Sequence, residues 1–282
     1  MFRNGVIINL EKKIRLLKNM NDGEFVAANS SNLYSTYAAR IREQGESEMD
    51  ITLFVACYNE EDNIIDTLDE VAKAMARLEL SWEVIIVDDA SRDRSVPLIQ
   101  EYMNVHPDYP LHLEVLKKNR GLAQNFIEAA FLGRGKHYRL INGDNVEDSA
   151  QITSILCHLG EADILIPTHI QSPNRTLFRR LLSLLFTGLV NGISGYKINY
   201  YNGCSVHLRY DVMRWHINSQ GFDFQADLIT RLLDQGKTYV EIPTVCGERQ
   251  HGSSSSLTLR NIVSAAHFLF GLVLRRIWRG NG

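Results

Sequence analysis

Between residues 51 and 166, short apolar runs of strand length alternate with longer segments whose apolar residues recur at helical spacing. The short runs are rich in Ile, Val and Leu, which is typical of strands that are buried on both faces of a parallel sheet. The predicted strands are 51–57, the run WEVIIVDDAS at 82–91, 111–116, 137–142 and 163–166. Helices are predicted at 64–75, 93–105, from 121 onward and at 149–159. This alternation predicts a Rossmann-like α/β fold with a mostly parallel sheet and right-handed crossovers.

The pattern changes after Pro173. The sequence then predicts a long apolar helix, an alternating strand or hairpin, a capped helix, a strand, a polar loop and an amphipathic last helix. These elements correspond to residues 175–193, 197–208, 221–236, 237–243, 248–256 and 257–278.

Three regions follow from these patterns. Residues 1–49 are polar and form an N-terminal extension, with one short helix expected around 10–17. Residues 50–256 form the α/β domain, and residues 257–282 form the C-terminal amphipathic helix. No internal repeat is visible along the chain.

Composition narrows the class of protein. The formal net charge of −3 gives no electrostatic case for a nucleic-acid binder, which would be expected to be basic. The four cysteines are far apart and contain no CxxC pair, which favours reduced thiols in a cytoplasmic protein. Charges interrupt every apolar stretch near the N-terminus, so we expect no cleaved signal peptide.

The C-terminal helix leaves two interpretations open. Its apolar stretch of about 13 residues is too short to span a bilayer. The arginines at its end, Arg275, Arg276 and Arg279, suit a helix that lies on the cytoplasmic surface of a membrane. The same pattern also suits a helix that packs on its own domain or on a dimer partner. Oligomeric state stays open.

The candidate chemistry lies where the predicted strands end. Ligands of open α/β sheets bind outside the carboxyl ends of the strands, and the motifs ACYNEED, VDDAS, NRG and NGDN all follow strands. One carboxylate there could bind a base or ribose hydroxyl, and a second could hold Mg²⁺ or Mn²⁺ against a diphosphate. The candidate metal ligand is Asp144. Taken singly, these residues also fit structural roles: Asp88 and Asp89 as turn residues, and Asn59 and Glu60 as helix caps.

The ordered motifs resemble a known family. YNEED, VDDASRD, NRGLAQNF and NGDN, followed by GFDFQAD and R-x-H-G-S-S, are similar to the family 2 glycosyltransferases of the GT-A fold. Within that family they resemble the dolichol-phosphate mannose synthase group and its bacterial polyprenyl-phosphate relatives. The likeness covers about residues 50–275 and is more specific to the fold and reaction class than to the substrate.

The resemblance implies a metal-dependent enzyme of glycan or cell-envelope biosynthesis that uses a UDP- or GDP-linked sugar. The residues that it places around the nucleotide are Ala56, Tyr58, Glu60, Asp88 and Asp89. Asp144 occupies the second acidic position of the family's Asp-x-Asp metal motif. Asn142 occupies the first position and can still offer a carbonyl oxygen, but one negative charge is missing.

The acceptor half of the site is also implied by the resemblance. Asp227 lies where the family carries a helix carboxylate near the sugar and acceptor, with Gln225 beside it. Arg249 matches an arginine that contacts phosphate groups, Ser253 lies in a loop that closes over the donor, and Arg179 matches a basic residue on the acceptor side. An acceptor oxygen would attack the anomeric carbon. A phosphate acceptor is already ionised, whereas a hydroxyl would have to give its proton to Asp227.

Several positions depart from the family pattern. The closing loop reads GSSSS where the family has Gly-x-Ser-Lys, and Leu184 stands where an arginine is expected. The family's Gly-Phe-Arg segment reads YYNGCSV here. The last two departures weaken the case for a lipid-phosphate acceptor and leave the donor half largely intact.

Two other classes of protein are alternatives to a glycosyltransferase. A catalytically inactive protein that binds a nucleotide sugar, with a regulatory or scaffolding role, would explain Asn142 and the missing lysine. A dinucleotide-dependent oxidoreductase is disfavoured, because the first strand leads into CYNEED with no GxGxxG to receive a pyrophosphate.

Overall fold

A computed structural model describes residues 49–171, 177–215, 221, 223–245 and 259–279. Contacts divide the chain into residues 1–46 and 47–282, so every described residue belongs to the second unit. The predicted helix around 10–17 and the predicted loop at 248–256 lie outside the described residues.

The described residues form a seven-stranded sheet in the order β3-β2-β1-β4-β6-β5-β7. All neighbours pair in parallel except β6, which runs antiparallel to both β4 and β5. This arrangement confirms the predicted α/β class with a mostly parallel sheet. The strands are β1 (Ile51–Cys57), β2 (Trp82–Asp88), β3 (Leu111–Val115), β4 (His137–Asn142), β5 (Ile164–Gln171), β6 (Val206–Leu208) and β7 (Tyr239–Val245).

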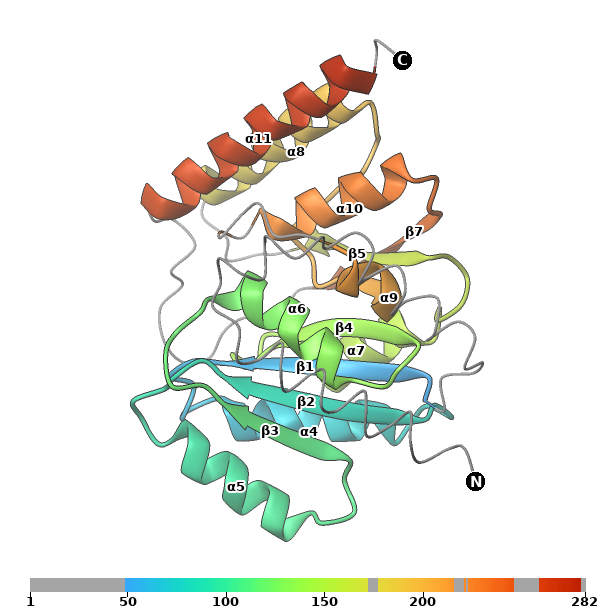
Figure 1. Cartoon of the computed structure of the whole chain (residues 1–282). Coiled ribbons are helices and arrows are strands. Elements are labelled where there is room, and N and C mark those ends of the chain that lie inside the picture. Colours follow the sequence, from blue (N-terminus) through green and yellow to red (C-terminus); the bar gives the residue numbers. More distant parts are fainter. Residues whose placement is uncertain (1–48, 172–176, 216–220, 222, 246–258, 280–282) are drawn as a thin grey trace, which may run out of the picture. The chain divides into compact units, whose positions relative to one another are not determined.

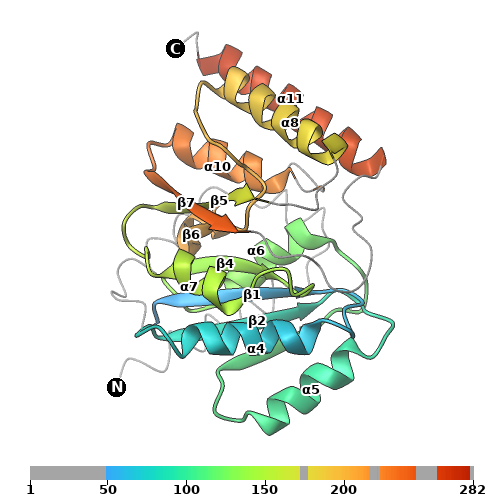
Figure 2. The same cartoon turned by 180° about the vertical axis from the view of Figure 1, so that it is seen from behind.

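Helices flank the sheet and follow the strands in chain order (Figures 1 and 2). The first four are α4 (Ile64–Met75), α5 (Ser95–Val105), α6 (Leu122–Leu132) and α7 (Ser149–Leu156). The later ones are α8 (Leu177–Ser194), α9 (Arg209–Met213), α10 (Phe224–Asp234) and α11 (Leu259–Arg279). The helix predicted at 64–75 is confirmed as α4. Its apolar stripe is buried and consists of Ile64, Leu68, Val71 and Met75.

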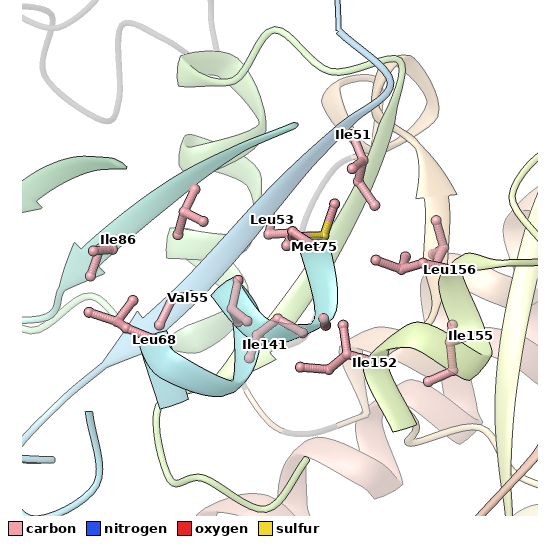
Figure 3. Close-up of a cluster of buried hydrophobic side chains, with 14 of the residues drawn as sticks. Ile51, Leu53, Val55, Leu68, Met75, Ile86, Ile141, Ile152, Ile155 and Leu156 are labelled. Carbon is pink, nitrogen blue, oxygen red and sulfur yellow. The ribbon is translucent and has the colours of Figure 1, made fainter. Parts of the chain in front are cut away.

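One face of the sheet packs against α4, α5 and α7. The alternate residues Ile51, Leu53 and Val55 of β1 point into this layer and are fully buried (Figure 3). Ile152 and Ile155 of α7 complete the same cluster. Burial of these aliphatic side chains is the main favourable term that fixes the sheet on these helices.

An aromatic cluster holds the opposite face of the sheet to α6. Phe126 of α6 is fully buried, with its ring centroid 5.0 Å from Tyr138 and 5.3 Å from Phe224. It also lies 6.3 Å from Phe54 and 6.4 Å from His207. Phe126 therefore packs α6 against β1, β4, β6 and the start of α10.

His207 in this cluster makes stability depend on pH. Burial lowers the pKa of His207 to about 4, well below the value of the exposed imidazole in the unfolded chain. The unfolded chain therefore binds a proton more readily, and stability falls as the pH falls from about 6.5 towards about 4.

We expect the free energy of unfolding to drop by about 2 kcal/mol from this residue between about pH 7 and about pH 5. Urea denaturation of the wild type and of His207→Gln at both pH values measures it. The variant should lose that part of the pH dependence; an unchanged dependence in the variant would contradict the assignment.

The predicted strand or hairpin at 197–208 is wrong in its extent, since only Val206–Leu208 form a strand. In the segment before it, Ile198 and Tyr201 are buried within a loop and not in a strand. Asn191 of α8 holds that loop: its side chain bonds both the N–H and the carbonyl of Ile198, and accepts from the Tyr201 hydroxyl at 2.8 Å. The sequence also gave no sign of the short helix α9.

The helices α8 and α11 pack side by side (Figure 1), with Phe186 and Phe268 in ring contact at 6.1 Å. Ion pairs join α11 to α10: Arg275 lies 3.2 Å from Asp227, and Arg276 lies 2.7 Å from Asp234. The predicted C-terminal helix therefore packs on its own chain through one side.

Candidate donor-binding site

The carboxyl ends of β1, β2 and β4 lie next to each other. In the strand register Cys57 is opposite Asp88, and Ala56 is opposite Asn142. The segments that follow these strands therefore share one edge of the sheet, as the motif order predicts.

Hydrogen bonds join the loops after β1 and β2 into one unit. Asn59 donates its N–H to Ser91 and accepts from the Arg92 N–H at 2.8 Å. The Glu60 N–H donates to Ser95, and the Glu60 carboxylate accepts from Asn63 at 2.9 Å. Glu60 thus stabilises the turn that leads into α4. Its contact with the nucleotide stays a prediction.

Residues with strained backbone conformations lie in the loops that follow β1, β2 and β4. The described non-glycine residues with positive φ are Asn59 (53°), Ala90 (64°) and Asn145 (52°). Each follows one of the strands β1, β2 and β4. Such conformations cost free energy and cluster at functional sites, which agrees with a ligand site at this edge.

A cleft of about 600 Å³ opens between the ends of β2 and β3. Asp88 is fully buried; its Oδ2 accepts the Ser91 N–H at 3.0 Å, and its Oδ1 has no hydrogen-bond partner in the described structure. Tyr58, half exposed, lines the same cleft. The cleft also carries basic side chains that the sequence reasoning did not select, namely Arg92, Lys117 and Lys118.

Asp89 is engaged in the protein itself. Its two carboxylate oxygens accept the N–H groups of Arg120 at 2.7 Å and Gly121 at 2.9 Å. Its own N–H donates to the Cys57 carbonyl at 2.9 Å. This residue therefore fixes the end of β2 to the start of α6, and its role toward a ribose stays a prediction.

The loop after β4 carries the predicted metal ligands. The Gly143 N–H donates to the Ala56 carbonyl at 2.9 Å, and a Cβ at Gly143 would lie 2.6 Å from that oxygen. The glycine therefore lets the loop close onto β1, which brings Asn142 and Asp144 to the sheet edge. Asn142 is half-buried and its amide donates to Cys204 Sγ at 3.5 Å.

A buried ion pair supports this loop. Arg139 of β4 is fully buried; it donates to Glu147 at 2.7 Å and to the Cys204 carbonyl at 3.1 Å. Burial raises the pKa of Glu147, and Arg139 opposes that rise. Asp144 adds a further negative charge beside Glu147. Arg139 thus offsets part of the negative charge that accumulates here.

The described residues contain no group of three His, Cys, Asp or Glu side chains arranged to hold a metal ion. Asp144 and Asn142 offer one carboxylate and one amide. That set fits a divalent ion that takes most of its ligands from substrate phosphates and water, as Mg²⁺ commonly does.

The acceptor-side residues are described only in part. Asp227 is buried and accepts from Arg231 at 2.9 Å and from the Trp215 Nε1–H at 3.2 Å. Gln225 is buried beside His207, and neither oxygen nor nitrogen of its amide has a well-formed hydrogen bond. Arg249, Ser253 and the side chain of Arg179 lie outside the described residues.

Sequence reasoning missed two buried polar residues. Asn125 of α6 belongs to the NRGLAQNF motif, and its Oδ1 is buried with no hydrogen-bond partner in the described structure. Asp223, just before α10, is buried with both carboxylate oxygens unpartnered. Both residues belong to motifs that the sequence already indicated. The burial of their unpartnered oxygens is visible only in the structure.

The chain is similar in sequence to curated proteins. A dodecaprenyl-phosphate galacturonate synthase from Rhizobium johnstonii is 26% identical over 57% of this chain and 47% of its own length. An undecaprenyl-phosphate 4-deoxy-4-formamido-L-arabinose transferase from Proteus mirabilis is 22% identical over 76% of this chain and 65% of its own. The chain thus spans about half to two thirds of the length of these two relatives.

Solved structures share the fold. Glucosyl-3-phosphoglycerate synthase from Mycobacterium tuberculosis, in complex with Mn²⁺, UDP and phosphoglyceric acid, has a TM-score of 0.58 and 13% identity over 81% of this chain and 78% of its own. TarS from S. aureus in complex with UDP has a TM-score of 0.52 and 13% identity, over 80% of this chain and 66% of its own. The family model of glycosyl transferase family 2 matches residues 52–215, more than half of the chain. The chain belongs to glycosyl transferase family 2 and has the GT-A fold.

Proposed function

We propose that this protein transfers a sugar from a nucleotide diphosphate sugar to a polyprenyl phosphate. The observation that supports this proposal most strongly concerns Asp88. Its carboxylate is fully buried with one oxygen unpartnered, and the residue lines the cleft of about 600 Å³. Such an oxygen is suited to accept a hydrogen bond from an N–H of a nucleotide base or from a ribose hydroxyl. Lys117, Lys118 and Arg92 give the cleft the positive charge that a nucleotide attracts.

The donor is a UDP-linked or GDP-linked sugar, and UDP in the structural relatives named above supports the first. A divalent ion, Mg²⁺ or Mn²⁺, neutralises charge on the leaving nucleoside diphosphate when it is bound. Asp144 and the carbonyl oxygen of Asn142 would hold it. Asp144 follows β4, and β1 alone separates β4 from β2, whose end lines the nucleotide cleft.

A polyprenyl phosphate acceptor is supported by the names of the curated relatives. This acceptor needs no strong base, because a phosphate is already ionised at neutral pH. That agrees with the position of Asp227, whose carboxylate is engaged by Arg231, Arg275 and Trp215. Asp227 would orient α10 toward α11 in this scheme.

A lipid acceptor requires a membrane, and α8 with α11 offers a surface for one. Neither helix contains Asp or Glu, and no helix among the described residues is long and apolar enough to cross a bilayer. Large exposed apolar patches mark interaction sites, and apolar helices with basic residues suit an interface with anionic lipid. The exposed apolar face comprises Leu181, Leu182, Leu184, Leu185, Leu189, Ile262, Val263, Phe270, Val273, Leu274, Ile277 and Trp278.

We expect the protein to float with vesicles that contain an anionic phospholipid. A Leu184→Asp, Phe270→Asp double variant should lose most of this binding, because both side chains are exposed on the apolar face at 69% and 63%. Val105→Asp is the matched control, since Val105 is 66% exposed on α5. A wild type that stays at the bottom of the gradient as a dimer would contradict the membrane assignment.

A transfer assay tests the proposed function directly. Purified protein, Mn²⁺, undecaprenyl phosphate in detergent and a panel of UDP- and GDP-sugars should yield a glycosylated lipid and one equivalent of nucleoside diphosphate. Binding of a donor without release of nucleoside diphosphate under any of these conditions would favour the inactive binding protein instead.

A further inference from the structure

Asp223 is a buried carboxylate that the protein leaves unsatisfied. It lies directly before α10 and is 3% exposed. Neither of its carboxylate oxygens has a hydrogen-bond partner among the described residues, and no ion pair in that part of the chain includes it. Burying an uncompensated carboxylate is costly, so its retention calls for a compensating interaction in another state of the protein.

Helix capping does not account for this residue. Asp223 occupies the N-cap position of α10, where a carboxylate ordinarily accepts an N–H of the first turn, but its side chain makes no such bond. The positive end of the helix dipole still favours a negative charge there. The position therefore leaves the Asp223 carboxylate available for a ligand.

Asp227, in the first turn of the same helix, differs from Asp223 in its hydrogen-bond partners. Asp227 lies one turn later and is equally buried, but Arg231, Arg275 and Trp215 engage its carboxylate. Asp223 has no such set. Of these two acids on the same helix, Asp223 is the one with capacity to accept a hydrogen bond from a substrate.

The Asp223 carboxylate is closely packed on one side by a glycine. Gly221 lies against it, and a Cβ at Gly221 would be 2.6 Å from Asp223 Oδ1 and 2.7 Å from Ser264 of α11. Any larger residue at 221 would push into this carboxylate. The other neighbour along the chain, Phe224, points into the aromatic core at Phe126.

The order of the strands gives the position of α10 across the sheet relative to the proposed donor site. The nucleotide cleft lies at β2 and β3, Asp144 follows β4, and β6 comes next in the sheet. The start of α10 is beside β6, because Gln225 lies next to His207. Figure 1 shows α10 beginning on the side where β1, β2 and β3 end. Beyond the diphosphate, the next part of the donor in this direction is the sugar.

The chemistry of Asp223 restricts what it can bind. A carboxylate repels phosphate groups and the carboxylate of a uronic acid, but it accepts hydrogen bonds from neutral hydroxyl groups. We propose that Asp223 is a specificity-determining residue that accepts a hydrogen bond from a hydroxyl of the transferred sugar and selects a neutral sugar over a uronic acid. This inference rests on the proposed function.

Calorimetric titration with UDP, UDP-glucose and UDP-galacturonic acid, with Mn²⁺ present, tests the proposal. The wild type should bind UDP-glucose at least about tenfold more tightly than UDP-galacturonic acid. Asp223→Asn should reduce that ratio about tenfold and change the affinity for UDP less than about twofold. An unchanged ratio in the variant, or a wild type that prefers the uronic acid, would overturn it.

A second readout separates a ligand-binding role from a structural one. Asp223→Asn should leave the ligand-free melting temperature unchanged or raise it, because the carboxylate that it replaces is buried without a partner. The matched control Asp234→Asn should lower it, since Asp234 is paired with Arg276 and Tyr196. A fall at Asp223 as large as at Asp234 would make Asp223 structural. Failure of the wild type to bind UDP would overturn the proposed UDP donor and this inference together, whereas UDP binding without sugar selection overturns this inference alone.

Discussion

Asp144→Ala should reduce sugar transfer by about a thousandfold, because the variant loses the only carboxylate of the proposed metal pair. Asn142 alone offers one neutral oxygen, which is a weak ligand for a divalent ion. The affinity for nucleoside diphosphate should also become independent of Mn²⁺. Rate measurements at saturating donor, together with titrations in Mn²⁺ and in chelator, give both quantities.

Asp148→Ala is the matched control for this experiment. Asp148 lies in the same loop, but its carboxylate caps α7 by accepting the Gln151 N–H at 2.7 Å. Its loss should cost about 1 kcal/mol of stability and leave the turnover rate within about threefold of wild type. Comparable turnover in Asp144→Ala and the wild type would reject the metal assignment.

Phe126→Ala should destabilise the fold by about 4 kcal/mol, among the largest effects expected of a single core substitution. Phe126 is fully buried and its ring contacts Phe54, Tyr138, His207 and Phe224. Truncation would leave a cavity where two layers of the domain meet. Equilibrium urea denaturation measures the loss.

Phe131→Ala on the same helix is the control for that prediction. Phe131 is 39% exposed, so its truncation removes less buried apolar surface and should cost no more than about 1 kcal/mol. Because Phe126 also packs against the start of α10, its replacement should lower the affinity for donor as well. Equal destabilisation by the two variants would contradict the role given to the aromatic cluster.

The strands of the donor half were predictable because their sequences carry the signal locally. Ile51–Cys57 is a strand with the predicted bounds, since an unbroken β-rich apolar run between polar segments has few other solutions. The motifs at the ends of β1, β2 and β4 then had to share one edge, because parallel strands end on the same side.

The remaining features depend on contacts between distant residues. The pairing of Asp227 with Arg275 joins residues 48 positions apart, which no local pattern reveals. Ile198 alternates with polar neighbours like a strand residue but is buried in a loop held by Asn191. The unsatisfied state of Asp223 is likewise a property of its surroundings, since the same sequence would fit an ordinary helix cap.

The central claim is that the strand-end residues bind a nucleoside diphosphate together with a divalent ion. A thermal-shift screen of UDP and GDP, each with Mn²⁺ and with chelator, tests it most directly. We predict that one of the two raises the melting temperature by about 3 °C or more with Mn²⁺ and by clearly less without it. No shift with either nucleotide in Mn²⁺, at concentrations up to about a millimolar, would contradict the claim.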